Sequence, residues 1–398
     1  MHLNKQGKEL IETDVFIIDE ISMVPKHALE IADRVLQELM GNKLPFGGKI
    51  VIIGGDFRQC LPIRKHGSKE QQLSLSVRRS YLWKYFKNEV FHLLENKRAE
   101  KSSTSKSKID FAKYILDMGN GDLSADEDDY VEVPEECVVK TDLVEEIFGP
   151  YIKTKYFSEM CKRVILASTH NKVLDVNNKV LNQLGLNGCL MKIYYSVDKV
   201  DEDEPDNCVD YPQEFLHTLH ESGLPPYELR LTEGCPVILV RNLNPAAGLS
   251  NGTRMQVEKM YQHVLQCKLL TGENAGQTVL IPKIKLTSSD LPFTLFRKQF
   301  PVKPCFAMTI NKSQGQTIDF VGIDLSDSVF SHGQAYVAFS RARGWDCIKV
   351  ATDPKRGNKI RNVVWKEILL DEPQNPPQKR KSTPPSKPVP SKRLRSKG

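Results

Sequence analysis

The sequence predicts an α/β protein made of two parallel-sheet units, with a small antiparallel β insertion in the second unit. Strand-like and helix-like segments alternate between residues 15 and 54, and again from about residue 163. Such alternation is typical of parallel strands joined by helices. Between 235 and 285 the pattern changes to short β segments separated by glycine-containing turns, which favours a small antiparallel barrel.

In the first unit, the segments 15–19 and 50–54 are short and apolar, and they predict buried strands. Between them, His27–Met40 places its apolar side chains at near-helical spacing, which predicts a helix. Three further segments complete this part: a strand at Phe91–Leu94, a polar loop at 100–108 and an amphipathic helix at 109–119.

In the second unit, residues 163–169 predict a strand and 171–184 a helix. An acidic stretch at 198–213 contains two prolines and predicts a loop or insertion. After the antiparallel segments, the parallel pattern resumes at three places: residues 306–314, 320–326 and 348–353.

The composition is that of an ordinary globular protein, with 398 residues, 40% hydrophobic and 27% charged. No apolar run reaches the length of a membrane span, and residues 1–14 contain no signal-peptide core, so we expect a soluble protein. Nine cysteines without a C-x-x-C pair indicate reduced thiols in the cytosol or nucleus rather than disulfides or a zinc site.

The net charge of +6 is concentrated at the C-terminus. Residues 373–398 contain eight Lys or Arg and no acid, which leaves −2 for the first 372 residues. We therefore expect a disordered basic tail, and any nucleic-acid surface on the folded part must come from local clusters. The tail has two interpretations, a nuclear localisation signal or nucleic-acid tether, and a merely solvated end.

The run VFIIDEIS at 15–22 carries the first chemical motif. A parallel strand delivers Asp19 and Glu20 to its carboxyl end, which is the arrangement of a Walker B motif. There Asp19 would hold a nucleotide-bound magnesium ion, and Glu20 would orient and deprotonate the attacking water. On its own this pattern occurs often by chance. Gln59, just past the second strand, strengthens it because a neutral amide can contact a γ-phosphate or its water.

Two later motifs add polar groups. Residues 303–317 combine hydroxyls, amides, a lysine and a glycine, and such a loop suits the phosphates of a single strand. The alternative is a capped helix start.

Residues 332–343 predict a packed helix that ends in Arg341 and Arg343, from which an arginine could reach a γ-phosphate across a domain edge. The alternative there is a solvated helix end.

Together, the motifs resemble those of the Pif-one/RecD-like DNA helicases of superfamily one, and most closely the helicase part of Helitron-type transposon proteins. The matching segments are IIDEISMV (17–24), GGDFRQCLPI (54–63), GCPVILVRNLNPAAGLSNGTR (234–254), FAMTINKSQGQT (306–317) and YVAFSRAR (336–343). The resemblance implies two RecA-like domains of the P-loop NTPase class, the first incomplete, with ATP and Mg²⁺ between them. It also implies 5′-to-3′ translocation on single-stranded DNA and unwinding at duplex junctions, in repair, recombination, telomere maintenance or transposon replication.

The resemblance also assigns roles and domain boundaries. Asp19 matches the magnesium ligand, Glu20 the catalytic base, Gln59 a phosphate sensor, Arg98 a γ-phosphate contact and Arg341 the arginine finger, with Gly315 beside the nucleotide. Thr309, Asn311, Lys312, Ser313 and Gln314 match the DNA-contacting motif, and Gly252 and Thr253 precede the β-barrel insertion. The expected divisions are 1–98 (partial first RecA-like domain), 99–160 (connecting segment), 161–353 (second RecA-like domain, with the barrel-like insertion at 235–290) and 354–398 (C-terminal segment, basic and disordered from about 373).

The family's Walker A loop does not occur in these 398 residues. Lys312-Ser313 resembles its end but lacks the preceding glycines. Without the loop, the β-phosphate has no backbone cradle. We therefore expect an N-terminally truncated helicase sequence, inactive as given, with an exposed apolar edge on the first sheet. The alternative is a catalytically dead remnant that binds single-stranded DNA or a partner. A small-molecule P-loop kinase or a GTPase is disfavoured, because neither needs the motifs SQGQT and SRAR.

Overall fold

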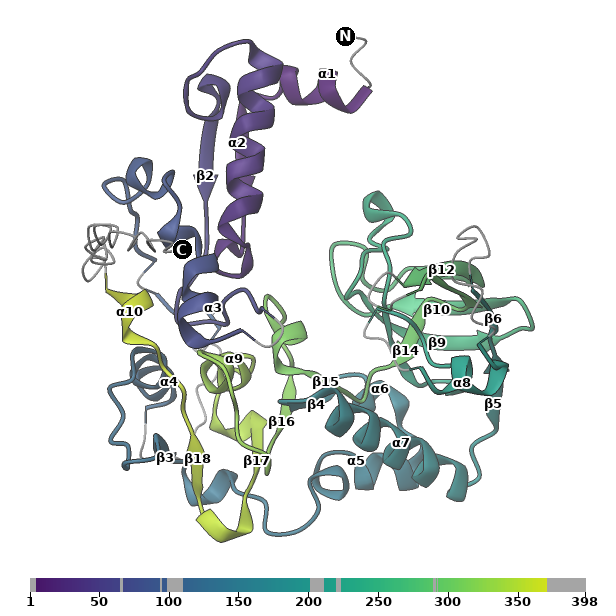
Figure 1. The fold of residues 1–398 in the computed structure, drawn as a ribbon. Coiled ribbons are helices and arrows are strands. Elements are labelled where there is room, and N and C mark those ends of the chain that lie inside the picture. Colours follow the sequence, from purple (N-terminus) through teal and green to yellow (C-terminus); the bar gives the residue numbers. More distant parts are fainter. Residues whose placement is uncertain are drawn as a thin grey trace, which may run out of the picture.

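The computed structural model describes residues 5–64, 67–93, 95–98, 110–200, 211–219, 223–288, 291 and 293–370. The predicted loop at 100–108, most of the acidic stretch at 198–213 and the basic tail from 373 therefore lie outside the described residues. Figure 1 shows a first unit standing above a second, with an all-β region at the side of the second. Among the described residues, no helix is both long and apolar enough to cross a membrane.

The first unit is built on a parallel pair of strands, in which Val15 lies opposite Ile50. Its elements are α1 (Lys5–Glu12), β1 (Val15–Ile18), α2 (Lys26–Met40), β2 (Ile50–Ile53) and α3 (Lys69–Leu75). The predicted strands and the helix between them are confirmed. Helix α2 buries Leu29 and Leu36, and it ends at Gly41, whose left-handed φ of 63° suits glycine.

The two strands are not buried as the sequence predicted, because only one face of the sheet is covered. Phe16 and Ile18, with their neighbours on β2, pack against the core around Leu29 and Leu36. On the opposite face, Ile17 is 75% exposed and Ile52 is 52% exposed. The sequence predicted an exposed apolar edge on the first sheet, whereas the exposed apolar side chains seen here lie on one of its faces, the open face.

The strand predicted at Phe91–Leu94 is wrong for its described residues, 91–93, which form no strand. Phe91 is 90% exposed and Leu93 is 98% exposed. An apolar run becomes a strand only where a neighbouring strand supplies hydrogen-bonding partners. In the described part of the first unit, the sheet consists of β1 and β2 alone.

The second unit has a four-stranded parallel sheet in the order β15-β4-β16-β17. Its strands are β4 (Arg163–Ala167), β15 (Ala307–Thr309), β16 (Phe320–Leu325) and β17 (Ile348–Thr352), and its helices are α4 (Phe111–Asn120), α5 (Leu143–Thr154), α6 (Phe157–Met160), α7 (His170–Leu186) and α9 (Gln334–Ser340). All the β4 residues are buried, because large apolar clusters cover both faces of the sheet. The predicted parallel strands and the helices at 109–119 and 171–184 are confirmed.

The β region is antiparallel throughout, as predicted, although it begins earlier and ends later than the predicted insertion at 235–290. Its strands are β5 (Met191–Tyr195), β6 (Val197–Val200), β7 (Glu228–Thr232), β8 (Pro236–Leu239), β9 (Arg254–Met260), β10 (Val264–Leu269), β11 (Thr278–Pro282), β12 (Ile284–Ser288), β13 (Leu295–Gln299) and β14 (Val302–Pro304), and its helix is α8 (Gln213–Thr218). They form sheets in the orders β11-β10-β9-β8-β14, β12-β13-β6 and β5-β7. The domain boundaries themselves remain predictions.

The segment after the second sheet crosses back to the first unit. Strand β18 (Lys359–Arg361) pairs with β3 (Tyr130–Glu132), and helix α10 (Lys366–Leu369) follows. Trp365 and Ile368 are buried against Leu61 and Leu73 of the first unit. The guanidinium of Arg78 donates to the carbonyl of Ile368 at 2.7 Å. This segment therefore ties the two units together (Figure 1).

Candidate functional site

The Asp19-Glu20 pair lies directly after β1, as predicted. Glu20 has a left-handed backbone (φ 52°, ψ 38°), which is uncommon for a residue other than glycine, and its N–H donates to Asp19 Oδ1 at 2.8 Å. The end of β2 is held against this turn, because the N–H of Ile21 donates to the carbonyl of Gly54 at 2.8 Å. Backbone bonding thus fixes both carboxylates beside the residues that follow β2.

The loop after β2, which carries Gln59, rests directly on the second unit. The Nε2–H of His332 donates to the carbonyl of Phe57 at 2.8 Å, and His332 Nδ1 accepts the N–H of Trp365 at 2.8 Å. Both ring nitrogens are therefore engaged, and burial lowers the pKa of this imidazole. At Gly333, φ is 74° and a Cβ would lie 2.4 Å from the carbonyl oxygen of Arg58. Only glycine permits this approach.

A second contact between the two units is a hydrogen bond whose acceptor is a charged carboxylate. The hydroxyl of Tyr336, on α9, donates to Asp56 Oδ2 at 2.6 Å. Burial, followed by the nearby Asp56 carboxylate, raises the pKa of Tyr336. Arg58 forms an ion pair with Asp56 at 3.3 Å and donates through Nε to Asn120 Oδ1 at 2.7 Å. The loop that carries Gln59 is thus bound by the same helix that leads into Arg341.

Gln59 also meets the third motif. Its Oε1 accepts a hydrogen bond from Gln314 Nε2 at 3.3 Å. The neighbouring Gly315 is close enough to Glu20 that a Cβ there would lie 3.6 Å from Glu20 Oε1. The structure therefore brings Glu20, Gln59 and the 314–315 turn together, although they come from distant parts of the sequence.

Two arginines complete this cluster. Arg341 is 3% exposed, and its guanidinium donates to the carbonyls of Val337 (3.0 Å), Ser313 (3.4 Å) and Gln316 (3.2 Å) and to Ser340 Oγ (2.7 Å). Arg98 Nε donates to Thr317 Oγ1 at 3.1 Å, and its Nη1 to the carbonyl of Ser340 at 2.5 Å. Although the described residues 91–93 form no strand before it, Arg98 still reaches the cluster.

The charges in this cluster are not paired with one another at contact distance. Within the described chain, neither Arg98 nor Arg341 forms an ion pair, and the hydrogen bonds of both guanidinium groups go to neutral oxygens. Burial, followed by the repulsion from Arg98, lowers the pKa of Arg341 to about 10. Burial raises the pKa of Glu20, the Asp19 carboxylate adds to this, and Arg341 opposes it. The Glu20 carboxylate is near these two partly desolvated cations but forms no contact ion pair with either, so the cluster is suited to a phosphate.

The carboxylates fit a magnesium site of the kind that a nucleotide brings with it. Glu20 Oε2 is buried and has no hydrogen-bond partner, and Asp19 is exposed. Mg²⁺ keeps several waters and is usually held by one or two carboxylates together with substrate phosphates. In the described residues, no group of three or more His, Cys, Asp or Glu could hold a metal, and such a nucleotide-borne ion needs none.

The five residues expected to contact DNA have different environments. Thr309 and Ser313 are buried, and Ser313 Oγ donates to the carbonyl of Ile310 at 2.7 Å. Asn311 Oδ1 accepts from Gln334 at 3.2 Å, whereas Lys312 is exposed. Although the residue Lys312 is exposed as a whole, burial lowers the pKa of its ammonium group, and the Ser313 hydroxyl stabilises the turn. Their role in DNA binding stays a prediction.

Sequence reasoning missed several residues that hold the site together. Asn177, on α7, accepts the N–H groups of Phe306 (2.9 Å) and Ala307 (3.1 Å), and so fixes the entry to β15. A polar residue on the buried face of a predicted helix was the available signal. His332 and Tyr336 lay within a motif that was noted only for its arginines, and nothing in the sequence alone showed that they face the 54–59 loop.

Comparison with known proteins gives the same family throughout. Residues 2–129 match the family model of PIF1-like helicases, and residues 214–260 match the model of the 2B domain of the DNA helicase Pif1. The ATP-dependent DNA helicase Pif1 of Bdellovibrio bacteriovorus is 26% identical over 85% of this chain and 68% of its own length. PIF1 of Xenopus laevis is 28% identical over 85% of this chain and 47% of its own length. The chain thus spans about half of that vertebrate relative.

Solved structures confirm the fold. The Pif1 helicase from Bacteroides, in complex with ADP-AlF3 and ssDNA, is 22% identical, with a TM-score of 0.61 over 93% of this chain and 77% of that one. The Pif1 helicase from Candida albicans is 23% identical, with a TM-score of 0.60 over 92% and 77% of the two chains. The two parallel-sheet units are therefore RecA-like. The family models and the curated relatives, taken together, show that the chain belongs to the PIF1-like helicase family.

Proposed function

We propose that this chain carries the motor of an ATP-dependent DNA helicase that moves 5′-to-3′ on single-stranded DNA. The observation that carries the proposal is the convergence of Arg98 and Arg341 near the Glu20 carboxylate, where neither arginine forms an ion pair at contact distance within the described chain. Burying unpaired cations is costly, and a γ-phosphate would offset that cost at this position. Several curated relatives are named ATP-dependent DNA helicases, which supports the same assignment.

Each group has a role that its position allows. Glu20, with its raised pKa and its unpartnered buried oxygen, would accept the proton of the attacking water. Gln59 would orient that water and, through Gln314, transmit loss of the phosphate to the DNA-side loop. Arg98 and Arg341 would stabilise the charge on the transferring phosphoryl group. Asp19 would hold Mg²⁺, which when bound neutralises phosphate charge.

The DNA partner follows from the position of Lys312 and from the relatives. Lys312 and Lys303 both lower the pKa of His170, after burial, so three basic groups lie near one another beside the 309–314 turn. Solved relatives are described with ssDNA and with forked double-stranded DNA. We infer that single-stranded DNA passes this turn, with the duplex junction ahead of it.

We further propose that these 398 residues do not hydrolyse ATP by themselves, because no G-x-x-x-x-G-K-[ST] loop occurs in the sequence to hold the β-phosphate. The test of the arginine site is therefore binding. At millimolar concentration, Mg·ATP should raise the melting temperature more than Mg·ADP does, and Arg341→Gln should remove that difference. Equal shifts with ATP and ADP in the parent chain would contradict a γ-phosphate site.

A second candidate is a catalytically dead remnant that binds single-stranded DNA or a partner. The absence of a phosphate loop from the sequence favours it. Transcript sequence upstream of the Met1 codon separates the two. An in-frame G-x-x-G-x-G-K-[ST] segment supports the motor, and a stop codon without such a segment supports the remnant.

The cellular role is also a proposal. DNA repair, recombination, telomere maintenance and transposon replication are the processes that the resemblance implies, and the basic segment 373–398 suits a nuclear localisation signal. Deleting 373–398 from a fluorescent fusion should leave the protein in the cytoplasm. Undiminished nuclear entry of the deleted form would overturn the localisation proposal.

A further inference from the structure

Half of the residues on the outer face of the sheet β12-β13-β6 are lysines, namely Lys199, Lys285 and Lys298; the others are Val197, Thr287 and Phe296. In the register of these strands, Lys285 lies opposite Lys298, and Phe296 lies opposite Lys199. Because side chains alternate across a strand, these residues share one face. The alternate positions, which include Leu286, Arg297 and Asp198, are buried on the other face.

The charged side chains on the two faces of this sheet differ in whether they form ion pairs. On the inner face, Arg297 and Asp198 form a fully buried ion pair at 2.6 Å. On the outer face, Lys199, Lys285 and Lys298 are exposed, and none of them forms an ion pair with a described carboxylate. Like charges directly opposite each other destabilise a sheet. The Lys285–Lys298 pair is therefore unfavourable for the fold alone, and an anion bound to this face would relieve the repulsion.

A fourth cation adjoins the face. The ammonium of Lys283 lies 5.5 Å from the ring of Tyr194 and 5.4 Å from that of Phe300. Burial lowers the pKa of Lys283, and the positive charge of Lys298 lowers it further. The lysines are thus close enough to repel one another, as expected of a surface that collects phosphates.

The aromatic group on this face is already occupied. The ammonium of Lys285 lies 3.5 Å from the ring centroid of Phe296, which is half-buried. A ring covered in this way cannot stack on a base, so the face is suited to sugar-phosphate backbone rather than to base recognition.

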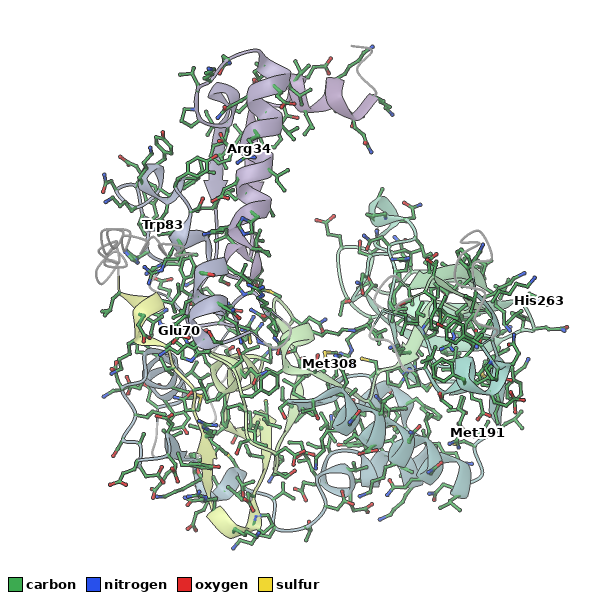
Figure 2. All side chains as sticks on the ribbon, viewed as in Figure 1. Arg34, Glu70, Trp83, Met191, His263 and Met308 are labelled. Atoms are coloured by element: carbon green, nitrogen blue, oxygen red, sulfur yellow. The ribbon has the colours of Figure 1, made fainter. Side chains whose placement is uncertain are left out.

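The face is remote from the nucleotide cluster. The N–H of Lys283 donates to the carbonyl of His263 at 3.3 Å. Figure 2 shows His263 at the outer side of the β region, turned away from the first unit. DNA that reaches this face must therefore extend beyond the 309–314 turn.

We propose that Lys199, Lys283, Lys285 and Lys298 bind the phosphate backbone of a DNA segment outside the stretch held by the motor, without sequence preference. This inference rests on the proposed function, since it requires a chain that binds DNA. It adds a second contact, which would hold either the continuing single strand or the adjoining duplex.

The test compares matched double variants of the full chain by fluorescence anisotropy over a series of salt concentrations. Lys285→Gln/Lys298→Gln removes the opposed pair. Lys259→Gln/Lys268→Gln removes two exposed lysines of the neighbouring sheet that lie opposite glutamine or threonine. Three DNAs are compared. The first is a single strand of about 8 nucleotides, which is within the usual range for one binding site. The second is a longer single strand, and the third is the short strand continued into a duplex.

On the longer single strand, Lys285→Gln/Lys298→Gln should reduce the steepness of log affinity against log salt by about 1.4. This value corresponds to two lost phosphate contacts at about 0.7 each. A reduced slope is also expected on the DNA that continues into a duplex. The slope should stay unchanged in the control variant and on the short strand. A loss confined to one of the longer DNAs identifies the segment bound. Lys285→Arg/Lys298→Arg should keep the parent slope, which separates charge from folding.

Unchanged slopes on all DNAs, or an equal loss on the short strand, would overturn this inference alone. A parent chain that binds none of the DNAs would overturn the proposed function, and this inference with it.

Discussion

The two parallel sheets of this molecule differ in how completely they are covered. In the second unit, Val164, Ile165 and Leu166 of β4 have no exposed surface, because helices pack on both faces of the sheet. In the first unit, β1 alternates, with Phe16 half-buried and Ile17 75% exposed. Parallel sheets are normally covered on both sides. The comparison shows that Asp19 and Glu20 follow a sheet that has packing on one face only, while Arg341 follows a helix that packs on a completely covered sheet.

The largest expected effect comes from truncating equivalent isoleucines in the two sheets. Ile165→Ala should lower the free energy of unfolding by about 2 to 5 kcal/mol, because it leaves a cavity in a filled core. Ile17→Ala should change it by less than about 0.5 kcal/mol. Urea unfolding of both variants measures the contrast, and an equal cost at Ile17 would show that its face is covered in solution.

A smaller effect is expected where the two units meet. Tyr336→Phe removes a hydrogen bond to the Asp56 carboxylate and should cost about 2 kcal/mol. The matched control is Tyr114→Phe. The Tyr114 hydroxyl donates to the Glu132 carbonyl within the second unit, and its removal should cost about 1 kcal/mol. A cycle with Asp56→Asn isolates the pair, and a coupling energy near zero would mean that this contact does not join the units in solution.

Glu20→Gln should stabilise the fold at neutral pH by about 1 kcal/mol, since the buried carboxylate oxygen lacks a partner. The folded-state pKa of Glu20 is raised above the ordinary 4.5, so protonation favours the folded state. The stability gained by protonating Glu20 is fully present below pH 4.5, and it is lost as the pH rises through the raised folded-state pKa. The advantage of the variant should therefore vanish on acidification. Thermal melting from pH 4 to 8 measures it, and an advantage that grows toward low pH would contradict the assignment.

The smallest effect on stability is expected from adding charge to the open face. Ile17→Lys/Ile52→Lys should alter the free energy of unfolding by less than about 0.5 kcal/mol per site, yet it should reduce self-association, because large exposed apolar patches promote it. Sedimentation velocity at several concentrations compares the variant with the parent. A parent that is monomeric at all of them would show that the open face does not cause association.

Much of the fold followed from local pattern. The strand-helix-strand alternation located β1, α2 and β2, and apolar periodicity located α4 and α7. Pattern failed where burial depends on the rest of the molecule. The run at 91–93 is apolar but has no neighbouring strand, and β1 is apolar on both faces although only one is covered.

The sequence also predicted the main residues of the candidate site, but not the residues that position them. Glu20, Gln59, Arg98 and Arg341 do converge, because strand ends and the motif-bearing helix meet at one edge. The groups that position them, His332 and Tyr336, could not be identified from the sequence, because their partners are a backbone carbonyl and a carboxylate nearly 280 residues away. Such contacts depend on how two units dock, and periodicity carries no information on docking.

We propose that Asp19, Glu20, Gln59, Arg98 and Arg341 form the ATP site of a PIF1-like motor, while the 398 residues contain no loop to hold the phosphates. ATP turnover by the purified chain with saturating single-stranded DNA tests this proposal most directly. We expect no turnover above that of a Glu20→Gln/Arg341→Gln control. Turnover that depends on DNA and is abolished in that control would show that the chain binds ATP productively without the loop, and would contradict the proposal.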